Sequence, residues 1–207
     1  MDVDDFRADV AAEAETELDR LGSSKRLVAL TAASLDDESV LRAAAASEAA
    51  AADVFAAWAT DASGDAAETF AAFAERERDH YERVAAELDA DVDADPGAVH
   101  DHLRDVEGTV ERAGAVVGRG LVAERTLAQF VSYFVNEADE QRADLFRDLR
   151  AETEEDTDAA IALLADAAAG EDDVERAKEA AVAVVDVAYE EYVDALESMG
   201  VNAKSVC

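Results

Sequence analysis

The sequence predicts an all-α protein, and three features of the chain indicate it. Apolar residues recur every three or four positions along most of the 207 residues, which is the repeat of amphipathic helices. Hydrophobic residues make up 50% of the chain, rich in alanine, so a core can form despite the charge. The 9 glycines and 1 proline are too few turn-formers for an all-β fold with many hairpins.

The first part of the chain reads as three long helices joined by short turns. A helix is expected at about 4–21, where Gly22 and two serines would end it, and a short apolar piece follows at 26–31. The second long helix is expected from Ser34 or Asp36 to about residue 62. The third is expected at 65–88.

The second part of the chain begins with a helix whose expected start contains the only proline. Asp95 before Pro96 is typical of an N-cap followed by proline at the first helical position. The fourth helix, which starts there, is expected to break near 114–120, because four glycines fall within thirteen residues of that region. Further helices are expected at 121–135, 143–169 and 171–199.

The connections are all short, so consecutive helices should be antiparallel neighbours in one domain over residues 1–207. An offset of 76 residues aligns the apolar stripes of 48–88 with those of 124–164 without a gap. Two related helical hairpins are therefore expected to form a four-helix core. The core is expected at about 38–165, with flanking helices at 4–21 and 171–199.

The charge of the chain is extreme, with 51 acidic against 18 basic residues and a net charge of −33. Such a surface repels phosphate backbones and anionic lipid headgroups, so no nucleic acid and no membrane is expected as a partner. Only three of the basic residues are lysines. This composition is typical of a salt-accumulating halophile, in which multimolar salt screens the carboxylates, so the acidity indicates habitat rather than function.

Other features of the chain bear on its location. No stretch approaches the ~18 apolar residues that span a bilayer. The N-terminal MDVDDFRADV lacks the basic-then-apolar pattern of a signal peptide. The single cysteine, Cys207, is the last residue, which excludes an internal disulfide and a Cys-x-x-Cys metal site. A cytoplasmic protein is expected.

Ionisable residues interrupt the apolar stripes of three helices. In the third helix the buried face reads Phe70, Phe73, Glu77, His80, Val84 and Leu88, and its middle two members can ionise. Glu48 lies at the centre of the second stripe, and Glu124 lies at the equivalent point of the fifth. Burying an unpaired carboxylate costs several kcal/mol, on the order of 3–5, so each needs a neutralising partner. Oxygen and imidazole ligands favour iron, manganese or zinc.

Glu48, followed seven residues later by Phe55, and then Glu77-x-x-His80 within FAAFAERERDHYERVAAEL resemble the ferritin-like superfamily, with rubrerythrin as the nearest branch. The resemblance covers about residues 38–165 and implies a four-helix bundle with a carboxylate-bridged metal site. It implies that Glu48, Glu77 and His80 serve a first metal, and that Glu124 serves a second. It also implies chemistry on peroxide or iron.

The second half of the implied site departs from the family pattern. The offset puts Thr153 where the second bridging glutamate belongs and Asp156 where the second histidine belongs. Asp156 remains a candidate fifth ligand. A shift of the alignment by one residue would bring Glu152 and Glu155 into the ligand positions, but it is disfavoured because it misaligns Phe146 and Leu149. One metal is therefore expected rather than a di-iron pair. The chain has no four-cysteine rubredoxin-like module, so peroxide reduction would require an external electron donor.

Metal-free alternatives stay open at this stage. Glu48 and Glu124 could instead form salt bridges with an arginine such as Arg78, Arg119 or Arg125. Glu77 and His80 could form hydrogen bonds across the bundle or lie at a hydrated edge, in a metal-free bundle that serves binding, scaffolding or regulation. His100 and His102, two apart, share no helix face and are expected at the surface. The last helix either packs on the bundle or forms a homodimer contact.

Overall fold

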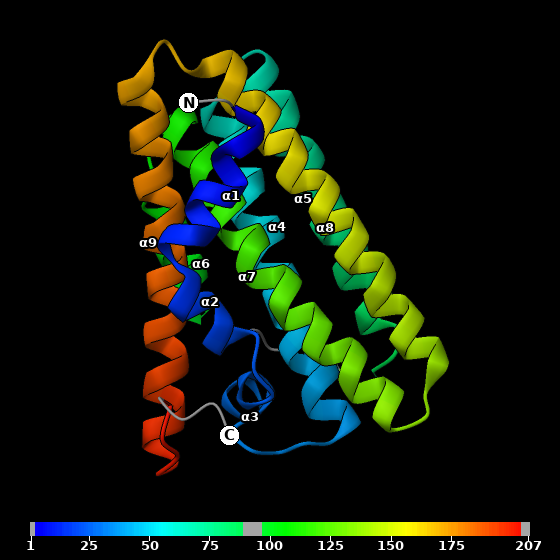
Figure 1. Cartoon of the computed structure of the whole chain (residues 1–207). Coiled ribbons are helices and arrows are strands. Elements are labelled where there is room, and N and C mark those ends of the chain that lie inside the picture. Colours follow the sequence, from blue (N-terminus) through cyan, green and yellow to red (C-terminus); the bar gives the residue numbers. More distant parts are fainter. Residues whose placement is uncertain (1–2, 89–96, 204–207) are drawn as a thin grey trace.

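The computed structural model describes residues 3–88 and 97–203, and every regular element in that part of the chain is a helix (Figure 1). The predicted all-α class is confirmed. The helices of the described residues are α1 (Val3–Glu13), α2 (Glu15–Leu21), α3 (Lys25–Leu30), α4 (Asp37–Asp61), α5 (Asp65–Ala85), α6 (Gly97–Arg104), α7 (Thr109–Asn136), α8 (Glu140–Ala167) and α9 (Glu171–Ser198).

Two long hairpins, α4–α5 and α7–α8, carry most of the chain, and α5 contacts α8 between them (Figure 1). Capping side chains define where α4 and α8 begin. The carboxylate of Asp36 accepts a hydrogen bond from the backbone N–H of Ser39 at 2.9 Å, and Asp139 accepts from that of Arg142 at 3.1 Å. The helix at 34–62 and the helix at 65–88 are thus found close to their predicted bounds.

The helix break expected near 114–120 is wrong, because α7 runs without interruption through this region. Its glycines serve close packing instead. A Cβ atom on Gly114 would overlap the backbone carbonyl of Ala177 in α9, and one on Gly118 would overlap that of Ala181. Small residues on both helices therefore let the backbones of α7 and α9 approach, and this contact settles the packing of α9 within one chain.

Two other boundaries differ from the sequence expectation. The first helix is divided at Ala14, which has φ −100° and ψ 25° and separates α1 from α2. The helix expected after Pro96 ends at Arg104, and Gly108 with φ 86° precedes α7. The predicted cap at Asp95 and Pro96 lies outside the described residues.

The hydrophobic core has two parts. One contains Phe55, Trp58, Phe70 and Phe73 with residues of α1, α2 and α9, and the other contains Phe130, Phe134 and Phe146. On α4, α5, α7 and α8 the two parts are separated by buried ionisable or hydroxyl residues. These are Glu48, Glu77, His80, Arg119, Glu124, Thr153, Asp156 and Thr157. A polar layer therefore crosses the middle of the helices.

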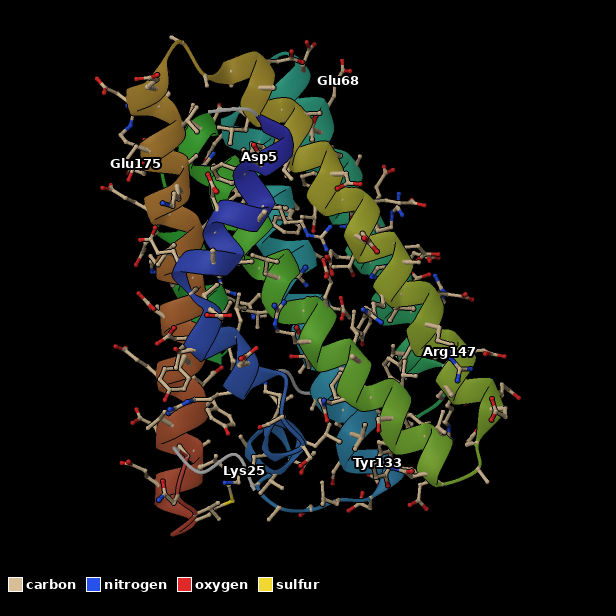
Figure 2. All side chains as sticks on the ribbon, viewed as in Figure 1. Asp5, Lys25, Glu68, Tyr133, Arg147 and Glu175 are labelled. Carbon is tan, nitrogen blue, oxygen red and sulfur yellow. The ribbon has the colours of Figure 1, made fainter. Side chains whose placement is uncertain are left out.

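The outer faces of the helices are rich in carboxylates, as Figure 2 shows for side chains such as Asp5, Glu68 and Glu175. None of the described helices is long and apolar enough to cross a membrane.

Candidate metal centre

Three side chains in the polar layer come together from two helices. Glu48 lies in the middle of α4, and Glu77 and His80 lie one turn apart on the buried face of α5. One ligand atom from each lies within 4.8 Å of the others, and all three residues are buried. Bonds of about 2.0–2.2 Å to one ion would need only a small closing movement. The sequence prediction that these three residues share one site agrees with this arrangement.

The imidazole of His80 has its two nitrogens in different surroundings. Its Nε2 lies 2.7 Å from a carboxylate oxygen of Glu152 on α8, which also accepts a hydrogen bond from Arg83 at 2.7 Å. A carboxylate only accepts, so Nε2 donates in this contact. Nδ1 lies 3.7 Å from Glu48 Oε2, and it is buried with no hydrogen-bond partner among the described residues.

A guanidinium group borders the same site. Arg119 of α7 donates to both oxygens of Glu77, at 2.7 and 3.0 Å, and its Nη2 lies 3.6 Å from Glu48 Oε2. Its Cζ also lies 5.5 Å from the ring centroid of Phe55. The salt bridge between Glu48 and an arginine that the metal-free alternative expected is therefore present, and Arg119 contacts Glu77 more closely than Glu48.

Burial raises the pKa of Glu77 to about 8, although the Arg119 charge opposes this shift and the neighbouring Glu48 adds to it. Burial likewise raises the pKa of Asp156 on α8 to about 6, against the nearby charge of Arg76. The interior thus holds more carboxylates than cations. Protons or a metal ion can compensate the excess, and both compete for the same oxygens.

Asp156 lies at the edge of this cluster. One of its oxygens is 3.6 Å from Arg76 Nε, and the other, Oδ2, is buried with no hydrogen-bond partner among the described residues. Thr153, in the place of a bridging glutamate, donates its hydroxyl to the backbone carbonyl of Leu149 at 2.9 Å. This hydroxyl is hydrogen-bonded within its own helix and does not replace the carboxylate ligand that a second metal would need.

Glu124 has a different partner from the one that the resemblance implies. Its carboxylate accepts a hydrogen bond from Arg7 of α1 at 2.6 Å, and it is not among the residues grouped around His80. The flanking helix α1 therefore supplies the charge that balances it. The repeat pattern correctly indicated that Glu124 is buried, but it could not reveal the arginine about 120 residues away.

Two members of the cluster, Glu152 and Arg119, were named from the sequence but were not assigned to this site. Glu152 orients His80, and the periodicity gave little sign of it, because Glu152 lies beside the apolar stripe of α8 rather than in it. Arg119 was one of three arginines named as possible salt-bridge partners, and its position between Gly118 and Gly120 in an otherwise apolar stretch of α7 distinguishes it from the other two. His100, expected at the surface, is buried, because α6 packs against α9 and α4.

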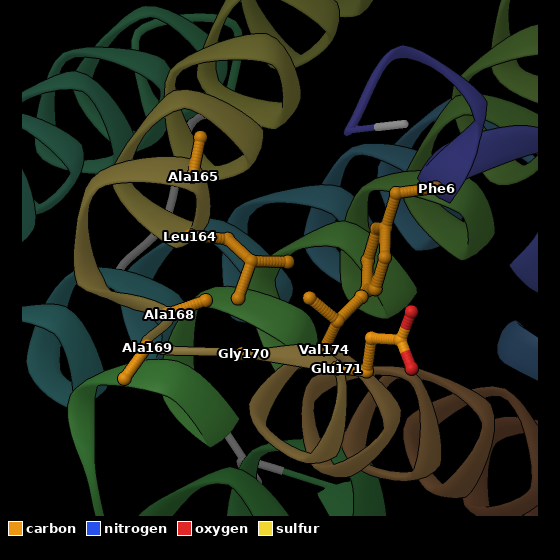
Figure 3. Close-up of a pocket in the computed structure, with 8 residues that line it drawn as sticks. All are labelled: Phe6, Leu164, Ala165, Ala168, Ala169, Gly170, Glu171 and Val174. Atoms are coloured by element: carbon orange, nitrogen blue, oxygen red, sulfur yellow. The ribbon is translucent and has the colours of Figure 1, made fainter. Parts of the chain in front are cut away.

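Two hollows in the described part of the chain bear on function. The smaller, about 310 Å³, lies where α8 turns into α9 and is lined by apolar groups such as Phe6, Leu164 and Val174 (Figure 3). It offers a single carboxylate, Glu171, and no cluster of reactive groups. The larger, about 630 Å³, lies among α3, α4, α6, α7 and α9, and Glu48 and Arg119 form part of its wall.

Comparisons with known proteins do not identify a family for this chain: no family model matches it, and neither a curated protein nor a solved structure does. The geometry itself supports a coarse statement, which is that this is a helical protein with a buried Glu-Glu-His cluster able to hold a metal ion.

Proposed function

We propose that the protein binds one divalent metal ion through Glu48, Glu77 and His80. The observation that carries this proposal is the buried Nδ1 of His80, which has no hydrogen-bond partner among the described residues and is turned toward Glu48. An unsatisfied buried nitrogen costs about 1–3 kcal/mol, which coordination to a metal would recover.

The outer partner of His80 supports the same conclusion. Histidines that bind metals usually donate their second ring N–H to a carboxylate, which fixes the tautomer and the ring orientation. Glu152 is placed to do this at 2.7 Å, and Arg83 holds Glu152 in turn. The mixed oxygen and nitrogen set favours iron, manganese or zinc.

The narrower form of the proposal is a ferritin-like, rubrerythrin-like protein that acts on peroxide or iron with a single metal. Two hairpins that each bury a glutamate at matching positions, Glu48 and Glu124, favour this form. Thr153 and the Arg7–Glu124 pair disfavour a second metal. Reduction of peroxide would then draw its electrons from an external donor.

One observation favours a second function, that of a metal-free bundle serving binding, scaffolding or regulation. Arg119 already satisfies both oxygens of Glu77, so the pair can be stable without a cation.

Thermal melting separates the two functions. Wild type, His80→Ala and His102→Ala are melted in molar KCl, with chelator and with Fe(II) or Zn(II) under anaerobic conditions. Bound metal stabilises the folded state by RT ln(1 + [L]/Kd). Metal binding therefore predicts a rise in melting temperature for wild type and for His102→Ala, and no rise for His80→Ala. His102 is the matched control because it is a histidine outside the cluster.

Identical wild-type curves in chelator and in metal would support the metal-free function. In that case His80→Ala should cost roughly 1–3 kcal/mol, equally with and without chelator.

A further inference from the structure

The larger cavity contains an unusual cation. Arg26, the second residue of α3, is 5% exposed and lines the cavity of about 630 Å³. Its Nε donates a long hydrogen bond of 3.3 Å to the hydroxyl of Thr126 on α7. Its two terminal nitrogens have no hydrogen-bond or ion-pair partner within 3–88 and 97–203.

A buried arginine that no carboxylate contacts within 4 Å in the described residues is unexpected in this chain, because carboxylates outnumber basic residues by 51 to 18. Arg119 has Glu77 and Arg7 has Glu124. The carboxylate of Glu191 lines the same cavity, but it accepts a hydrogen bond from the backbone N–H of Ala98 at 2.9 Å. Its charge acts on Arg26 from a distance, and no ion pair within 4 Å joins the two side chains among the described residues. Burial of a charge that no carboxylate contacts is costly, so an anion that binds Arg26 directly would stabilise the site.

The rest of the wall is mostly apolar. Leu30, Val99, Val122, Leu127 and Phe130 face the cavity together with several alanines. Its volume falls within the roughly 300–1,000 Å³ that is typical of small-molecule sites. A ligand that fills it would therefore carry an apolar body and one polar head.

The charges in the wall limit the head to one negative charge. A planar guanidinium with both terminal nitrogens available fits a carboxylate through two parallel hydrogen bonds. Glu48 and Glu191 also line the cavity, so the second charge of a phosphate dianion would be repelled. We propose that this cavity binds an amphipathic monocarboxylate, with the carboxylate on Arg26 and the apolar body against Leu127 and Phe130.

The carboxylate would bind at Arg26 on α3, whereas the proposed metal centre touches this cavity only through Glu48 in its wall, so the proposal does not require a metal. The salt dependence should also be unusual. The net charge of −33 repels an approaching anion, and salt screens that repulsion, whereas the contact with buried Arg26 is screened much less. Affinity is therefore expected to rise, not fall, between dilute buffer and molar KCl.

Isothermal titration calorimetry with decanoate tests the proposal, with decan-1-ol as the uncharged probe of equal length and chelator present throughout. Wild type should bind one decanoate per chain and bind decan-1-ol at least tenfold more weakly. Arg26→Met, which keeps the length and removes the charge, should lose about tenfold or more in decanoate affinity. Arg112→Met is the matched control, because that arginine pairs with Asp61 outside the cavity.

A second pair of variants keeps the test independent of the folding of Arg26→Met. Ala46→Phe fills the cavity from α4 and should abolish binding, while Ala49→Phe, on the same helix but outside the lining, should not. The proposal is overturned if wild type binds no decanoate, if decan-1-ol binds as tightly as decanoate, or if Arg26→Met or Ala46→Phe binds like its control.

Discussion

Replacing Arg119 with Met should destabilise the protein by an amount that depends on pH. Arg119 and Glu77 are almost fully buried and share two hydrogen bonds of 2.7 and 3.0 Å. Breaking a buried pair by removing one partner costs about 3–5 kcal/mol when the other charge stays ionised. The cost is smaller where Glu77 can take up a proton instead.

The pH window follows from the pKa of Glu77, which burial raises from its ordinary 4.5 to about 8. Between these values the folded state binds more protons than the unfolded state, so stability is greatest at the acid end and falls as the pH rises toward 8. In Arg119→Met the pKa is higher still, because the opposing charge is gone. We expect a loss of about 1–2 kcal/mol at pH 6, from the hydrogen bonds alone, and about 3–5 kcal/mol at pH 9.

Urea unfolding of wild type and Arg119→Met at pH 6 to 9, in molar KCl with chelator, measures this difference. Arg42→Met, which removes an exposed pair with Glu38 on α4, should cost at most about 1 kcal/mol at every pH. The double variant Glu77→Gln with Arg119→Met should be close to wild type, since no charge is left unpaired. A loss in Arg119→Met that does not change with pH would refute the assignment of the proton to Glu77.

Three further predictions concern packing, salt and the metal. Gly118→Ala should cost about 1–3 kcal/mol in urea unfolding, because its Cβ would overlap the backbone of Ala181, whereas Gly170→Ala, which meets open space, should cost under 1 kcal/mol. The melting temperature should rise steeply between dilute buffer and molar KCl, since the charge of −33 repels itself, and a flat profile would contradict the halophile interpretation. Adding Zn(II) should recover more stability in Arg119→Met than in wild type, because removing the competing cation frees Glu77, and equal recovery would place the ion elsewhere.

Much of the fold could be predicted from periodicity. The stripes of α4, α5, α8 and α9 gave their bounds within a few residues, and the interruption of those stripes correctly placed Glu48, Glu77 and His80 in one layer. Periodicity reports which face of a helix is buried, because side chains three and four apart share a face. It does not show at which point along its length one helix contacts another.

The features that periodicity could not predict depend on where along their lengths the helices contact one another. The glycines at 114 and 118 do not break α7. The backbone of α9 lies against them, and the absence of a side chain at both positions allows this close packing. Arg119 meets Glu77, and Arg7 meets Glu124, across sequence separations of 42 and 117 residues. Local pattern contains no information about contacts of that range, which only the packing of the helices determines.

Metal content tests the central proposal most directly. Wild type, His80→Ala and His102→Ala are purified in molar KCl without added metal, dialysed against equimolar Fe(II), Mn(II) and Zn(II) under anaerobic conditions, and analysed by mass spectrometry of the elements. A single-ion site at Glu48, Glu77 and His80 predicts about one metal per chain in wild type and His102→Ala, and a stoichiometry near zero in His80→Ala. Wild type that retains no metal, or His80→Ala that retains as much as wild type, would contradict it.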